Sequence, residues 1–182
     1  MPRVNFDAMP EDARLWIFAA DRPLSAAERD LLLGRVDAFL EEWKAHGVTL
    51  TAARDWRYDR FLFIGVNEAV AGVSGCSIDA LVNDMKALES ELSVTLVDNS
   101  PVTFRDGNSI QHVQRQEFAE LAVGGTVDGD TLVFNNTLTT VGQLRAGEWE
   151  VRASHSWHGE AFLAPRSPQS HASTDLRYQE KL

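Results

Sequence analysis

The chain has 182 residues, a formal net charge of −10 and 44% hydrophobic residues. These values predict one compact domain with a full hydrophobic core, and they argue against the basic surface that nucleic acid or an anionic membrane would require. The single cysteine, Cys76, excludes an intrachain disulfide and favours a reducing compartment. No apolar run approaches the ~18 residues of a membrane-spanning helix and no secretory signal pattern follows Met1, so we expect a cytoplasmic protein.

The first predicted elements are a strand and a helix. Residues 1–12 form a polar lead-in, and residues 14–19 are aromatic and branched, as in a central strand. Ser25 and Glu28 have the spacing of a capping box, which predicts a helix beginning there. That helix is expected to end at His46-Gly47, with glycine in the left-handed position, and to bury Leu32, Val36, Phe39, Leu40 and Trp43.

A hairpin, a second helix and a further strand are predicted next. Residues 49–57 and 60–66 favour two strands joined by a tight turn at Tyr58-Asp59. From residue 76 to 92 the apolar residues follow the period of a helix with one buried face: Ile78, Leu81, Val82, Met85, Leu88 and Leu92. Residues 94–97 are predicted to form a fourth strand, ended by a turn at 98–101.

This order of elements predicts an α+β fold, a ferredoxin-like βαββαβ sandwich over residues 13–100 with both helices on one face of a four-stranded antiparallel sheet. Strand alternation then predicts which side chains face the helices and which face away. Leu15, Ile17, Leu62, Ile64 and Val66 are expected on the helix side, and Trp16, Phe18, Phe61 and Phe63 on the other.

In this predicted fold the four aromatic side chains on the face without helices form a patch that is too large to remain in contact with water in an ordinary monomer. We expect residues 101–164 to cover this patch. The alternatives, in decreasing order of preference, are a second copy of the chain in a homodimer and a bound ligand. This extension is predicted to contain a helix between residues 110 and 122, a hairpin turning at Asp128-Gly129 and a short final helix. Trp149 and Trp157 are expected to cover the patch, and residues 165–182 are expected to form a flexible tail.

The segment around Cys76 is the leading candidate site. Ser74 and Ser77 are suitable N-caps, and the N–H groups of the first turn, including those of Gly75 and Cys76, favour an anion. A first-turn cysteine can act as a nucleophile, with Asp79 as proton acceptor. The alternative is that Cys76 has no chemical role and is present only because the junction of loop and helix requires a small residue.

Two other patterns have structural alternatives. Trp16, Arg60, Phe61 and Phe63 resemble in placement the stacking aromatics of RNA-binding sheets, but Arg60 replaces the expected glycine and the acidic balance opposes phosphate contact. A covered sheet face is the favoured interpretation. His155 and His158 lack the spacing of a known metal motif, so no metal site and no cofactor are predicted.

Several segments together resemble a family of small uncharacterised bacterial proteins. They are Trp16 with Asp21-Arg22, Trp43 to Gly47, Arg60-Phe61, Phe134-Asn135-Asn136, Trp149-Glu150, Ser156-Trp157 and, most specifically, Ser74 to Asp79. Some members carry the label ABC-transporter ATPase, but this chain has no phosphate-binding loop of the Walker A type. The resemblance implies a common domain and supplies no activity.

We therefore expect a binding or regulatory protein that contacts a small anionic ligand or a protein partner through the Cys76 loop or the aromatic face. The alternative is a cysteine-dependent enzyme or thiol redox sensor. Neither nucleic acid nor membrane is an expected partner.

Overall fold

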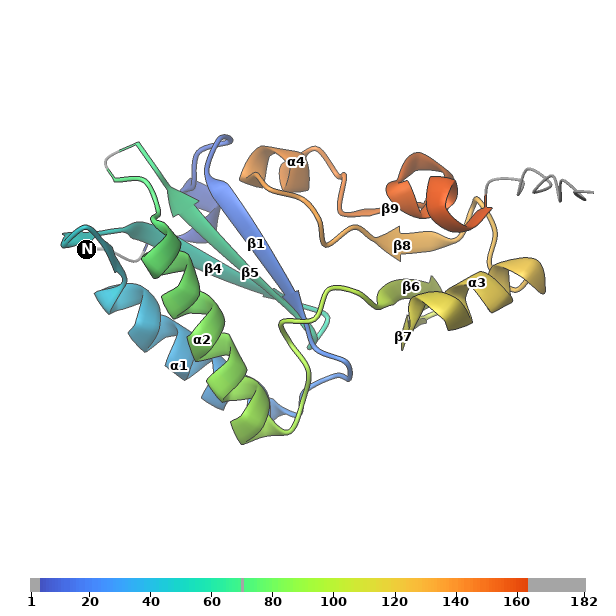
Figure 1. The fold of residues 1–182 in the computed structure, drawn as a ribbon, viewed down its shortest axis with the longest axis horizontal. Helices are drawn as coiled ribbons and strands as arrows, with labels where there is room; N and C mark the ends of the chain where they lie inside the picture. The colour runs from blue at the N-terminus through green and yellow to red at the C-terminus, as the bar shows by residue number, and fades with distance from the viewer. Residues whose placement is uncertain (1–3, 70, 164–182) are drawn as a thin grey trace, which may run out of the picture.

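The computed structural model describes residues 4–69 and 71–163. The predicted tail at 165–182 lies outside the described residues. The protein is α+β, with two separate main sheets and helices beside each of them (Figure 1). No helix in the described part of the chain is long and apolar enough to cross a membrane.

The first half of the chain forms a three-stranded antiparallel sheet in the order β1-β5-β4, with α1 and α2 on one face (Figure 1). A short 3-10 helix, η1 (Phe6–Ala8), precedes this sheet. The other elements are β1 (Arg14–Ala19), α1 (Ala26–Glu42), the small hairpin β2 (Lys44–Ala45) and β3 (Val48–Thr49), β4 (Thr51–Arg57), β5 (Phe61–Asn67) and α2 (Gly75–Leu92).

The second half forms a four-stranded antiparallel sheet in the order β7-β6-β8-β9. Its elements are β6 (Val102–Asp106), β7 (Ser109–Val113), α3 (Arg115–Val123), β8 (Leu132–Phe134), α4 (Val141–Arg145), β9 (Glu150–Arg152), the 3-10 helix η2 (Ala153–His155) and the π-helical turn η3 (Gly159–Leu163).

Residues 94–97 do not form the predicted fourth strand, and within the described residues the first sheet has three strands instead of the four of the predicted ferredoxin-like sandwich. The Glu89 carboxylate accepts the backbone N–H groups of Leu96 at 2.6 Å and Val97 at 2.7 Å, and these donors are no longer available to a strand ladder. The edge of β1 pairs instead with a distant segment, because Leu15 N–H donates to the Thr139 carbonyl at 2.8 Å.

The predicted orientation of β1 is wrong, whereas that of β5 is confirmed. In the β1–β5 register Ile17 lies opposite Phe63 and Phe18 lies opposite Leu62, and opposed residues of an antiparallel pair point to the same face. Ile17 therefore shares the face of Phe63, away from the helices, while Trp16 and Phe18 pack on the helix side.

The end of α1 also differs from the prediction. Helix α1 stops at Glu42, and Trp43 continues in an extended conformation that turns its side chain into the core. His46 and Gly47 have positive φ angles of 51° and 80° and form the turn of the β2–β3 hairpin, not a helix cap.

The second half of the chain, together with the N-terminal segment that contains Phe6 and Met9, covers the face of the first sheet opposite α1 and α2. Trp149 is 3% exposed, and its ring lies 4.9 Å from the Phe61 ring and 4.8 Å from the Phe63 ring. Trp157 does not take part, because it packs against Phe162 in the core of the second sheet. Trp149, but not Trp157, covers the aromatic face as predicted.

The predicted elements of the extension are partly wrong. Residues 109–113 form a strand, so the helix begins only at Arg115. The predicted hairpin at Asp128-Gly129 is a local turn in which Asp128 Oδ1 accepts the N–H of Thr131 at 3.0 Å. Strand β8 pairs with the distant strands β6 and β9.

Candidate functional site

The start of α2 is built as its sequence predicts. Ser74 is the N-cap, and its hydroxyl accepts the N–H of Ser77 at 3.2 Å. The Ser77 hydroxyl in turn accepts the N–H of Ser74 at 2.8 Å, which completes a reciprocal capping box. Gly75, Cys76 and Asp79 are exposed. The serine hydroxyls therefore hold the helix start, while the thiol faces solvent.

Aromatic residues connect the start of α2 to β1. The Trp43 indole donates a hydrogen bond of 2.9 Å to the Ser77 carbonyl, and the Trp16 ring lies 6.0 Å from the Trp43 ring. The guanidinium of Arg14 stacks over Trp16 at 4.8 Å. Of the predicted site residues, the structure thus brings Trp16 toward the Cys76 segment, with Trp43 between them.

No base is joined to the Cys76 thiol. Among the described residues, neither Cys76 nor the Asp79 carboxylate makes a side-chain hydrogen bond or ion pair, and Glu68 is engaged with the N–H of Val73 at 2.9 Å. His112 lies on β7, where its Nδ1 is 2.9 Å from the Thr103 hydroxyl. Burial, followed by the nearby Arg60 guanidinium, lowers the His112 pKa. The geometry does not complete a nucleophile–base pair.

Arg60, Phe61 and Phe63 belong to the interior and not to a ligand surface. Phe61 and Phe63 are fully buried under the second half of the chain. Arg60 is 4% exposed and donates to the Ile110 carbonyl on β7 at 3.3 Å, so it links the two sheets. Burial lowers the Arg60 pKa. The prediction that these three side chains bind a ligand is corrected by their burial.

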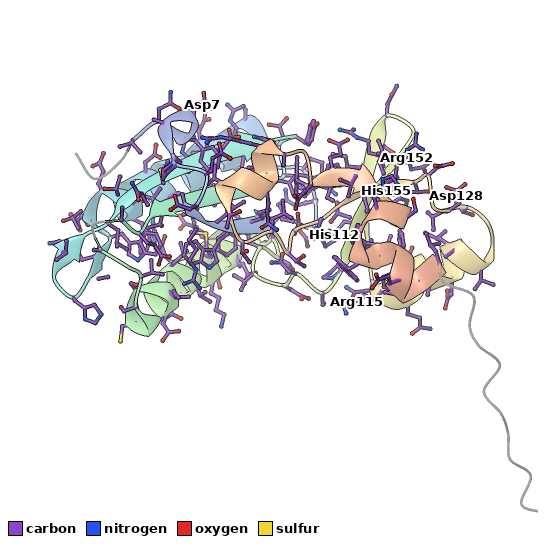
Figure 2. All side chains as sticks on the ribbon, turned by 90° about the horizontal axis from the view of Figure 1, so that it is seen from above. Asp7, His112, Arg115, Asp128, Arg152 and His155 are labelled. Atoms are coloured by element: carbon purple, nitrogen blue, oxygen red, sulfur yellow. The ribbon has the colours of Figure 1, made fainter. Side chains whose placement is uncertain are left out.

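The two nearby histidines are not arranged as a metal pair. His155 is exposed, whereas His158 is 1% exposed, with its Nδ1 2.6 Å from the Ser156 hydroxyl. Burial, and then Arg115, lowers the His158 pKa to about 4, which keeps the ring neutral at pH 7. The described residues contain no cluster of three or more His, Cys, Asp or Glu side chains that could hold a metal ion. Figure 2 shows His112, Arg115 and His155 in the half of the molecule that contains the second sheet.

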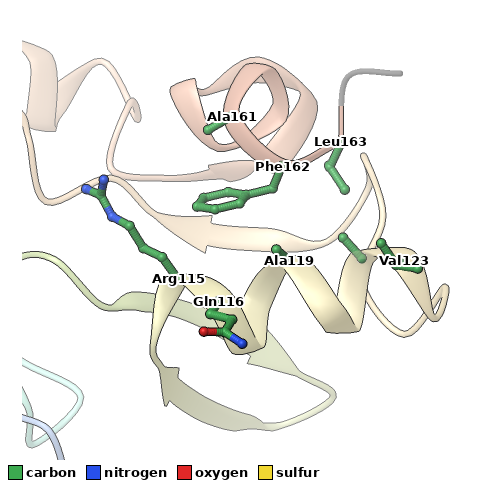
Figure 3. A pocket seen from close by; sticks show the side chains of 8 residues that line it. Arg115, Gln116, Ala119, Val123, Ala161, Phe162 and Leu163 are labelled. Carbon is green, nitrogen blue, oxygen red and sulfur yellow. The ribbon is translucent and has the colours of Figure 1, made fainter. Parts of the chain in front are cut away.

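Residues of α3 line several hollows, and two of these bear on function. The first, which we call the apolar hollow, lies between α3 and η3 and has a volume of about 580 Å³ (Figure 3). Arg115 and Gln116 stand on its α3 side, and the rest of its lining is apolar: Ala119, Ala122, Val123, Ala161, Phe162 and Leu163. Leu163, on its rim, is the last described residue.

The second, which we call the polar hollow, has a volume of about 400 Å³. Phe104 lies opposite Gln111 and Val102 opposite Val113 in the β6–β7 register, so these side chains share one face of the second sheet. Helix α3 has only nine residues and covers part of that face. The remaining strip is bounded by the β6–β7 turn, α3 and the segment before β8: Phe104, Arg105, Asp106, Gly107, Gln111, Val113, Glu117, Leu121, Thr126 and Thr131.

The polar hollow combines an apolar floor with a polar rim. Phe104, Val113 and Leu121 form the apolar part, and six polar residues and Gly107 complete the lining, so it is more polar than the usual small-ligand pocket. Its volume falls within the range of roughly 300–1,000 Å³ that is common for pockets that bind small organic molecules. The sequence does contain a signal for the β6–β7 hairpin, because Asp106-Gly107-Asn108 separates two runs of alternating residues. The hollow itself depends on how α3 packs and has no local signal.

No family model, curated protein or solved structure matches this chain. Function is therefore inferred from the geometry of the chain itself.

Proposed function

We propose that this chain is a binding protein and that the polar hollow is its binding site. The observation that carries the proposal is a concave site of about 400 Å³ in which the buried Phe104 lies in the floor, and the rim carboxylates of Asp106 and Glu117 have no hydrogen bond or ion pair within the described residues. A binding protein is also the function class expected from the sequence, but the proposed site is different. The aromatic face of the first sheet is covered by the protein itself, so the site is placed in the polar hollow.

A ligand-observed NMR screen with small aromatic probes of positive, neutral and negative charge tests the proposal. Gln111→Phe places a ring on the floor of the polar hollow and should abolish binding of any probe that occupies it. Gln116→Phe, the same substitution in the lining of the apolar hollow, is the matched control and should leave binding unchanged. Failure of every probe to bind, or equal effects of the two substitutions, would reject the polar hollow as a site.

A second candidate function is a cysteine-dependent enzyme or redox sensor that uses Cys76. The exposed thiol at the start of α2 favours it, and an anion could reach the first-turn N–H groups of Gly75 and Cys76. The missing base partner among the described residues favours the binding function. Because Cys76 is the only cysteine, alkylation by iodoacetamide reports on it alone. If the rate at pH 7 is no faster than that of a reference peptide thiol, the enzyme candidate loses its support.

A further inference from the structure

The rim of the polar hollow carries two free carboxylates. Asp106 lies at the end of β6 and Glu117 in the first turn of α3, and both residues line the hollow. Within the described part of the chain, neither carboxylate makes a hydrogen bond or an ion pair. The Gln111 amide donates to the Ser109 hydroxyl at 3.2 Å, which leaves its carbonyl oxygen as a further acceptor.

Arg105, the residue before Asp106, is committed elsewhere. Arg105 alternates with Phe104 and Asp106 along β6, so its side chain points to the opposite face of the sheet. There its guanidinium forms an ion pair with Glu150 and stacks over the Tyr58 ring at 4.7 Å. The negative charge of Asp106 and Glu117 is therefore not neutralised by Arg105.

The floor of the hollow is apolar. Phe104 is buried, and Val113 and Leu121 pack against the same core as Phe104. A ligand that fills this space must present an apolar body to the floor and hydrogen-bond donors to the rim. Thr126 adds a hydroxyl at the rim, whereas the Thr131 hydroxyl is engaged with Asp128 at 2.9 Å and 3.2 Å.

We propose that the polar hollow binds an organic cation, an amine or guanidine with an apolar portion, whose charge lies between Asp106 and Glu117. The inference rests on the proposed function, since it names the ligand class of the same site. A net charge of −10 also raises the local concentration of cations at the surface. The same chemistry is offered by a free amine and by a lysine or arginine side chain of a partner protein.

Calorimetric titrations of the full chain with 2-phenylethylamine and 2-phenylethanol test the ligand class, because the two probes differ only in the cationic group. We expect the amine to bind at least about tenfold more tightly than the alcohol, a difference of about 1.4 kcal/mol. The double variant Asp106→Asn/Glu117→Gln should reduce amine affinity to that of the alcohol. Asp130→Asn, at a carboxylate that pairs with Arg152 outside the hollow, is the control and should leave the amine affinity unchanged.

The titrations distinguish failure of the cation proposal from failure of the proposed binding function. If both probes bind equally, or if the double variant retains the preference for the amine, the cation proposal is wrong while the hollow remains a binding site. If no probe of any charge binds, the proposed function fails as well. A third titration uses a short lysine peptide and its acetylated form: tighter binding of the lysine form than of the free amine identifies a partner side chain as the source, and the reverse identifies a free amine.

Discussion

The Trp43 indole Nε1 lies 2.9 Å from the carbonyl oxygen of Ser77, and this hydrogen bond fastens the end of α1 to the start of α2. Trp43 is almost fully buried, so the bond is shielded from water. The Trp16 ring of β1 also packs against Trp43, with 6.0 Å between the ring centroids, so Trp43 contacts both β1 and the segment that contains Cys76.

Trp43→Phe should destabilise the fold more than Trp56→Phe does. Both substitutions remove a similar volume, but only the Trp43 indole has a hydrogen-bond partner, whereas the buried Trp56 Nε1 has none among the described residues. A hydrogen bond contributes about 1 kcal/mol, and removal of an unpaired buried donor carries no such loss. Urea unfolding of both variants measures the difference. Equal destabilisation, or a larger loss for Trp56→Phe, would contradict the assigned contact.

Trp149→Ala should cost about 3–5 kcal/mol of unfolding free energy, because it removes a buried ring from the cluster that joins the two halves of the chain. Val123→Ala is the control, since Val123 is 83% exposed and its truncation should change stability by less than about 0.5 kcal/mol. Both values come from urea unfolding. A Trp149→Ala loss as small as that of the control would show that residues 134–149 do not cover the first sheet.

The ion pair between Arg22 and Glu28 at the start of α1 should make the free energy of unfolding depend on pH in the acidic range. The Arg22 guanidinium, at 2.7 Å from Glu28 Oε1, and next the N–H of Ser25 lower the Glu28 pKa to about 2. A depressed folded-state pKa contributes stability above the unfolded value of about 4.3, and that contribution is lost as pH falls toward 2.

Glu28→Gln removes this contribution, so the stability difference from the wild type should be present at pH 6 and shrink between about pH 5 and pH 2. Thermal unfolding across this range measures it. Glu41→Gln, an exposed site on the same helix, should follow the wild type throughout. A Glu28→Gln difference that stays constant with pH would show that the Glu28 carboxylate does not form these bonds in solution.

Local chemistry made much of the first half predictable. The capping box of α1 forms as predicted, and Ser74, one of the two N-caps predicted for α2, caps that helix. The turn at Tyr58-Asp59 is also present, with positive φ angles of 54° and 50°. Cys76 therefore lies at the helix start, as expected.

The errors arise where distant segments decide the structure. Glu89 takes the donors of residues 96–97, and the segment at Thr139 takes the edge of β1, so a strand with suitable composition does not form. The face of Ile17 follows from its register with Phe63, which the alternation of β1 alone does not define. The polar hollow likewise depends on the short α3 lying over a sheet whose strand order is not sequential.

An NMR chemical-shift titration of the full chain with 2-phenylethylamine tests whether the polar hollow is the binding site, because it locates the bound probe on the chain. We expect the largest backbone amide shifts at Asp106, Gln111, Glu117 and Thr126, and we expect Gln111→Phe to remove them. Shifts concentrated in residues 74–79, or no saturable shifts at all, would contradict this assignment.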